Sequence, residues 1–200
     1  EQKKYSKLAD AFTPLAKGMN SEYANQNAYD AIQIHGGSGF IMEYKSQRLY
    51  RDARIFSIYE GTTQLQVVAA IRYITNGTYL GIIKEMLGRE VDESLKTLKA
   101  RIEKMVEKYE EVLEEVKAEG NQEKQDFVAR RLYEMTADII MSLLIVEDAT
   151  RAPELFAKSA NVYVRMAHAE VAAHYDFIKN FNAADLDYYR QLETEKQDAE

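Results

Sequence analysis

Apolar positions recur with helical spacing over most of this 200-residue chain. In the clearest stretch the spacing alternates between four and three residues: Val91, Leu95, Leu98, Ile102, Met105, Tyr109, Val112 and Val116. That alternation is the heptad seam of helices packed in bundles and coiled coils. Because Glu and Lys fill the positions between, the pattern predicts one long helix with a buried face and a solvated face.

The remainder of the second half has the same character. Gly120-Asn121 predicts a turn, and Ala152-Pro153 predicts the start of a helix. We therefore expect a helical bundle, whose further helices cover about residues 123–149, about 152–180 and about 183–195.

The first half is less regular. Thr13-Pro14 predicts a helix start after an earlier helix ends near residue 12, because threonine is a good N-cap and proline suits the first helical position. The apolar stripe that follows runs to His35, where glycines end it. The later elements expected are a loop at 40–44, a short helix capped by Ser46 and running to Arg54, an extended segment at 55–59, and helices at about 62–74 and 79–87.

Composition supports an all-α fold. The chain has two prolines, nine glycines, 30 % charged residues and an apolar fraction of 46 %, which is enough for a core. We expect two domains, residues 1–88 and residues 89–200, because Gly88 precedes the change to a regular heptad pattern. Residues 1–100 carry 13 basic and 11 acidic residues, whereas residues 101–200 carry 13 and 22.

Several classes of protein are disfavoured. The net charge of −7 argues against nucleic acid or an anionic membrane as the main partner. There is no apolar run near eighteen residues, which argues against a membrane span, and no signal peptide is recognisable. The absence of cysteine fits a reducing compartment. We expect the bacterial cytoplasm or, in a eukaryote, the mitochondrial matrix.

One stretch carries residues that packing alone does not explain. Gly36, Gly37 and Gly39 lie within four residues, and glycine lets another molecule approach the backbone closely. Further on, Glu60 and Gly61 precede a predicted helix. A carboxylate at such a break is either a helix-dipole partner in the first turn or a positioned base.

Three linked segments give this stretch a resemblance. Gln33-Ile34-His35-Gly36-Gly37-Ser38-Gly39, Tyr50-Arg51-Asp52-Ala53-Arg54 and Ile58-Tyr59-Glu60-Gly61-Thr62-Thr63 resemble the C-terminal signature of the acyl-CoA dehydrogenases. The similarity covers about residues 1–75 and includes Thr13-Pro14-Leu15-Ala16-Lys17. Family members carry a helical domain and a β-rich domain ahead of this segment, so we expect the chain to be the C-terminal part of a longer polypeptide, with an added helical bundle.

The resemblance implies roles for individual residues. Glu60 is the general base that takes the α-proton of an acyl-CoA while FAD accepts the β-hydride, which gives the trans-2,3-enoyl-CoA of fatty acid β-oxidation. Burial of its carboxylate against flavin and acyl chain would strengthen it as a base. Gly61 contacts the substrate. The FAD contacts that it implies are Thr62, Thr63 and Gln64 on the flavin, and Gln33, Ile34, His35, Gly36 and Gly37 on the adenosine-diphosphate part of a FAD bound mainly to a neighbouring subunit. The alternative for these residues is helix capping alone.

The resemblance also implies partners. They are an acyl-CoA substrate, an electron-transfer flavoprotein that reoxidises the flavin, and further copies of the chain in a homodimer or homotetramer. We expect no metal site, because His168 and His174 are six residues apart and far from His35. Arg51, Asp52 and Arg54 are expected to form ion pairs that position the Glu60 loop. By itself the chain is expected to be inactive and to retain no FAD. The rival hypothesis is a family member with weak or no dehydrogenase activity, whose helical extension serves oligomerisation, partner docking or nucleic-acid binding.

Overall fold

The structure is a computed structural model that describes residues 2–182 and 184–188. These residues form helices and turns without any strand, which confirms the all-α prediction. The chain divides into two compact units, residues 1–79 and residues 80–200. The domain boundary that we expect after Gly88 stays a prediction. Among the described residues, no helix has both the length and the apolar character needed to cross a membrane.

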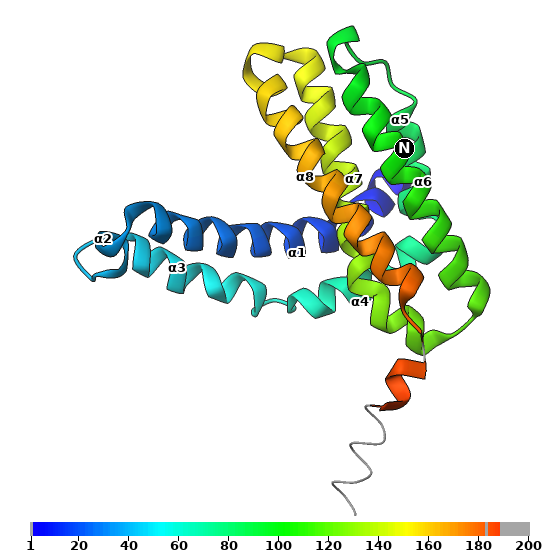
Figure 1. Ribbon diagram of the computed structural model, residues 1–200, viewed down its shortest axis with the longest axis horizontal. Helices are drawn as coiled ribbons and strands as arrows, with labels where there is room; N and C mark the ends of the chain where they lie inside the picture. The colour runs from blue at the N-terminus through cyan, green and yellow to red at the C-terminus, as the bar shows by residue number, and fades with distance from the viewer. Residues whose placement is uncertain (1, 183, 189–200) are drawn as a thin grey trace, which may run out of the picture. The chain divides into compact units, whose positions relative to one another are not determined.

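The first unit is built along one long helix, α1 (Figure 1). The helices α3 and α4 pack against it. The residues buried between them are mostly small or β-branched, including Ala11, Leu15, Val67, Ala70 and Ile74. The elements are α1 (Gln2–His35), α2 (Gly37–Phe40), α3 (Ser46–Arg54), the 3-10 helix η1 (Ile55–Ser57), α4 (Thr63–Thr75) and the start of α5 (Thr78–Leu87).

The predicted helix start at Thr13-Pro14 is wrong, because α1 continues through both residues. A proline inside a helix loses one backbone hydrogen bond and destabilises it by roughly 3 kcal/mol. Burial of Ala11 and Leu15 on either side of the proline favours the continuous helix. The Thr13 hydroxyl does not cap a new helix but donates to the Ala9 carbonyl, 2.7 Å away.

Two local predictions around Glu60 also need correction. The segment 55–59 is not extended: η1 covers Ile55–Ser57, and the amides of Ile58 and Tyr59 both donate to the Ile55 carbonyl. The apolar, partly β-branched composition favoured an extended segment, but hydrogen bonds within the segment close it into a turn. Ser46 is the first residue of α3 and not its cap, and its hydroxyl donates to the Gly39 carbonyl at 3.1 Å.

The second unit holds the remainder of α5, the 3-10 helix η2 (Glu93–Leu95) and three long helices, α6 (Lys96–Glu119), α7 (Gln122–Arg151) and α8 (Pro153–Asn180). These three pack on one another. From Leu95 onward every member of the predicted heptad seam is buried, whereas Val91 precedes the helix. Of the helix expected at 183–195, residues 184–188 are helical. Residues 183 and 189–195 lie outside the described part of the chain.

Candidate functional site

An open cleft of about 570 Å³ lies in the first unit, between the middle of α1 and the turn that follows η1. Tyr59 and Glu60 contribute its wall on the turn side, together with Phe56. The α1 side presents one face of the helix: Thr13, Ala16, Lys17, Asn20, Ser21 and Ala24. Glu60, the residue singled out by the sequence, therefore lines a cleft large enough for a ligand.

Glu60 has an unusual backbone conformation. Its φ of +51° makes it the only positive-φ residue other than glycine in the described chain, and Gly61 follows with a φ of +93°. The left-handed region is unfavourable by about 1–2 kcal/mol for a residue with a Cβ atom. Such strain persists only where the surroundings over-determine the backbone, and it gathers at functional sites. The Glu60 side chain is exposed in this structure.

The turn is fixed from the α1 side by side-chain donors. The ammonium of Lys17 donates to the carbonyls of Phe56 and Gly61, at 2.8 Å and 2.5 Å. One helical turn later, the buried Ser21 hydroxyl lies 2.6 Å from the Lys17 carbonyl and 3.0 Å from the Phe56 carbonyl, and its single proton can go to either acceptor. Sequence reasoning included Lys17 in the resemblance but gave it no role. The sequence alone does not reveal these contacts, because they join residues about forty positions apart.

The N-terminus of α4 follows directly. Thr62 is its N-cap, and its side chain accepts from the Leu65 amide at 3.3 Å. The buried Thr63 hydroxyl donates to the Glu22 carboxylate at 2.6 Å, which ties the helix start to α1. Gln64 is exposed. The amides of the first turn of a helix have no intrahelical acceptor, so this end can receive an anionic or carbonyl ligand.

The segment from Gln33 to Gly37 lies elsewhere in the first unit. It forms the end of α1 and the start of α2 (Figure 1), whereas the α1 residues that line the cleft end at Ala24. From Lys17 to Gln33, α1 extends for about 24 Å at 1.5 Å per residue. The structure thus does not bring these residues together with Glu60, and the sequence-predicted residues form two separate groups.

The glycines at and just after the end of α1 have different structural roles. Gly36 has a φ of +61° and ends α1, and a Cβ atom placed on Gly36 or Gly37 meets no other atom within 4 Å. A Cβ on Gly39 would lie 2.6 Å from the Ile32 carbonyl oxygen, so Gly39 serves the chain's own packing. Gln33, Ile34 and His35 are all exposed. Open backbone and exposed polar groups leave this end accessible to another molecule.

The predicted ion pairs beside the Glu60 loop are not formed. Within the described chain, neither Arg51 nor Asp52 makes a salt bridge, and both are exposed. Arg54 donates to the Ser57 hydroxyl at 2.5 Å. The charged residues of α3 point to solvent because the buried face of this short helix is the one that carries Ser46 and Ala53. The support of the loop comes from Lys17 and Ser21 instead.

Comparison with known families covers nearly the whole chain. Residues 1–74 match the family model described as "Acyl-CoA dehydrogenase, C-terminal domain", and residues 75–186 match "Acyl-CoA dehydrogenase C terminal". The chain belongs to the acyl-CoA dehydrogenase family. This finding confirms the resemblance drawn from the three motifs.

Individual relatives fit this membership. A caffeyl-CoA reductase–Etf complex subunit from Acetobacterium woodii is 56 % identical over 52 residues, which is 26 % of this chain and 14 % of that protein. Curated relatives of the family are much longer, and this chain spans only 10–17 % of their length.

Solved structures give the same picture. An acyl-CoA dehydrogenase family protein from Porphyromonas gingivalis is 36 % identical, with a TM-score of 0.54 over 57 % of this chain and 98 % of that chain. An acyl-CoA dehydrogenase from Bacillus anthracis, complexed with FAD, is 22 % identical, with a TM-score of 0.67 over 89 % of this chain and 34 % of that chain. The second likeness shows the shared fold.

Proposed function

We propose that this chain is the C-terminal part of a FAD-dependent acyl-CoA dehydrogenase and supplies its catalytic glutamate, Glu60. The observation that carries the proposal is the strained Glu60 backbone at the edge of the cleft, directly before the N-terminus of α4. A fixed backbone conformation at Glu60 sets the direction in which its side chain leaves the turn toward the cleft, which helps a base to reach one particular C–H bond.

In the proposed reaction Glu60 removes the proton from the carbon next to the thioester carbonyl of an acyl-CoA. Gly61, with no side chain, lets the thioester approach the turn closely. The enolate-like charge that develops is stabilised by donors aimed at the thioester oxygen. FAD, when bound, accepts the hydride from the neighbouring carbon. The product is the trans-2,3-enoyl-CoA.

The residues present suit a flavin dinucleotide. Thr62, Thr63 and Gln64 surround the free amides at the start of α4, which suit the carbonyl groups of a flavin ring. At the C-terminal end of α1, Gln33–Gly37 offer exposed polar groups and open glycine backbone for a diphosphate and its sugar. Because the two groups lie far apart along α1, they suit different parts of the cofactor, or two cofactor molecules.

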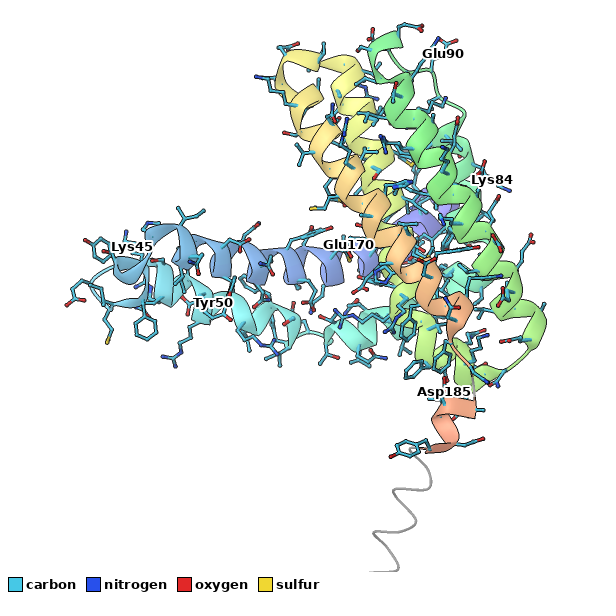
Figure 2. The ribbon with its side chains drawn as sticks, viewed as in Figure 1. Lys45, Tyr50, Lys84, Glu90, Glu170 and Asp185 are labelled. Carbon is cyan, nitrogen blue, oxygen red and sulfur yellow. The ribbon has the colours of Figure 1, made fainter. Side chains whose placement is uncertain are left out.

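The protein surface around Gln33–Gly37 supports an assembly of several subunits. Apolar side chains gather near α2 and the start of α3, at the end of the unit marked by Lys45 in Figure 2. Met42 is 87 % exposed, Ile34 is 84 % exposed and Phe40 is 77 % exposed. Clustered apolar side chains of this size are normally covered by another protein surface. A homodimer or homotetramer, in which this end contacts FAD held by a neighbouring subunit, would cover them.

A second candidate is the reverse reaction, reduction of a 2,3-enoyl-CoA. The observation in its favour is the 56 % identity with the Acetobacterium woodii protein, which is named as a reductase in an Etf complex. The same residues serve both directions, since Glu60 would then return a proton to the α-carbon. In either direction we expect an electron-transfer flavoprotein to exchange electrons with the enzyme.

The test uses the full-length enzyme that contains this chain, purified with FAD. We expect butyryl-, octanoyl- or palmitoyl-CoA to bleach the flavin, and we expect Glu60→Gln to slow the bleaching by at least about 1,000-fold while flavin stays bound, because the base is lost. Stopped-flow absorbance of the flavin measures the bleaching rate in the wild-type enzyme and in Glu60→Gln. The ranking of the three thioesters gives the preferred chain length.

The control for direction compares the bleaching rate with the rate at which an enoyl-CoA reoxidises the flavin of chemically reduced enzyme. Because one site catalyses both directions, only reoxidation much faster than bleaching would favour the reductase. A flavin-loaded enzyme that reacts with no thioester in either direction would contradict the proposal. It would favour instead a family member without dehydrogenase activity, whose helical extension serves assembly or binding.

A further inference from the structure

Lys17 on α1 contacts the Glu60 turn on both sides of the glutamate. Its Nζ atom donates to the carbonyl of Phe56, four residues before Glu60, and to the carbonyl of Gly61, the next residue. It also lies 5.9 Å from the centre of the Tyr59 ring, within range of a cation–π interaction. One ammonium group thus joins the beginning and the end of the turn.

These contacts explain how the strained backbone is maintained. The Gly61 carbonyl accepts from Lys17 and, at 3.2 Å, from the Gln66 side chain. Two donors on one carbonyl fix the orientation of the peptide group between Gly61 and Thr62. The φ of Gly61 itself is +93°. The second anchor, at Phe56, fixes the other end, so that the positive φ of Glu60 is determined from both directions.

The choice of lysine is otherwise unexplained. Within the described chain Lys17 makes no salt bridge, although it is half-buried. Burying part of a cation is unfavourable unless hydrogen bonds compensate for lost hydration. The compensating acceptors here are two backbone carbonyls of the Glu60 turn, together with the ring of Tyr59. An apolar residue would fill the same space, but it would leave the Gly61 carbonyl with the Gln66 side chain alone and the Phe56 carbonyl with the Ser21 hydroxyl alone, so that no single group would join the two ends of the turn.

We propose that Lys17 is a positioning residue for Glu60: by joining the carbonyls of Phe56 and Gly61, it holds the turn in the conformation that directs the Glu60 carboxylate at the substrate. The inference rests on the proposed function, since it takes Glu60 to be the base. Lys17 itself exchanges no proton with the substrate in this scheme.

The test replaces Lys17 in the full-length, FAD-loaded enzyme. At saturating thioester we expect Lys17→Met to slow flavin bleaching about 100-fold, the loss typical of a catalytic group displaced by about 1 Å. Lys17 lines the cleft, but its ammonium donates to the two turn carbonyls, so in this scheme the thioester dissociation constant should stay within about threefold of the wild-type value. Lys17→Arg, which keeps donors for both carbonyls, should restore most of the rate.

The matched control is Lys7→Met, at an exposed position of the same helix with no hydrogen bond or ion pair in the described structure. It should leave the bleaching rate unchanged. A Lys17→Met enzyme that bleaches at the wild-type rate would overturn the inference. So would a rate loss that Lys17→Arg does not relieve, because the role would then not depend on the two donors.

A second readout does not depend on activity. Hydrogen exchange followed by mass spectrometry should show faster exchange of the amides at 56–61 in Lys17→Met than in wild type or Lys7→Met. Unchanged exchange there would overturn the positioning role even if activity fell. If the wild-type enzyme reacts with no thioester, the proposed function and the catalytic role of Lys17 both fail, whereas the exchange measurement still decides whether Lys17 holds the turn.

Discussion

At the scale of single residues, two acidic residues have unusual conformations or surroundings. Glu60 occupies a backbone conformation that glutamate ordinarily avoids. In the second unit, Asp138 of α7 is only 8 % exposed, and burial raises its pKa from 3.8 to about 7. The Tyr163 hydroxyl, 3.2 Å away, lowers this pKa, whereas the charges of Glu170 and Glu134 raise it further. Glu170 lies on α8 (Figure 2).

This buried carboxyl predicts a pH-dependent stability. In the unfolded chain Asp138 ionises near pH 4, but in the folded chain it resists ionisation until about pH 7. Its contribution to stability is therefore fully present below pH 4, is lost as the pH rises toward 7, and is absent above that. We expect Asp138→Asn to raise the free energy of unfolding by roughly 1–3 kcal/mol at pH 8, with a smaller effect at pH 5.

Urea unfolding followed by circular dichroism at both pH values measures this difference. Asp148→Asn is the matched control, because Asp148 lies on the same helix and is exposed. It should show little change at either pH. Equal effects of Asp138→Asn at pH 5 and pH 8 would show that ionisation of this group is not the cause.

At the scale of elements, the long helices of the second unit follow directly from their patterns. The seam of α6 was predictable because buried positions in a helix recur every three or four residues, whatever the helix packs against. The first unit was less predictable. Continuation of α1 through Pro14 and the 3-10 turn at 55–57 both go against local preference, and contacts made by the neighbouring helices decide them.

The bundle offers a paired test of packing on one helix. Leu132 of α7 is fully buried, whereas Leu144 of the same helix is 46 % exposed. Leu132→Ala should lower the free energy of unfolding by about 2–5 kcal/mol, since it removes buried apolar surface and leaves a cavity. Leu144→Ala should change it by less than about 1 kcal/mol. Chemical denaturation compares the two, and similar losses would mean that α7 is packed differently.

At the scale of the whole molecule, the chain holds the complete Glu60 turn, but the cleft beside this turn is open. Glu60 is exposed and its cleft is open to solvent. An open groove gives a flavin ring little buried contact. The proposed enzyme needs surfaces from the rest of the longer protein, or from other copies, to close this site.

The 200-residue chain by itself should therefore purify without flavin and without dehydrogenase activity. An absorbance spectrum after purification, and again after incubation with FAD and gel filtration, measures retention. The full-length enzyme treated in the same way is the positive control. A flavin band that stays with the isolated chain would contradict this expectation.

The sequence alone determined the helical class, the bundle helices with the seam of α6, and the family signature around Glu60. All of these depend on residues close together in the chain, where spacing and side-chain type are sufficient. The tertiary structure decided the rest: the continuity of α1, the burial of Asp138, the separation of Gln33–Gly37 from Glu60, and the contacts from Lys17 to the turn. Those contacts span 39 and 44 residues, and they form only because helix packing places α1 beside the turn.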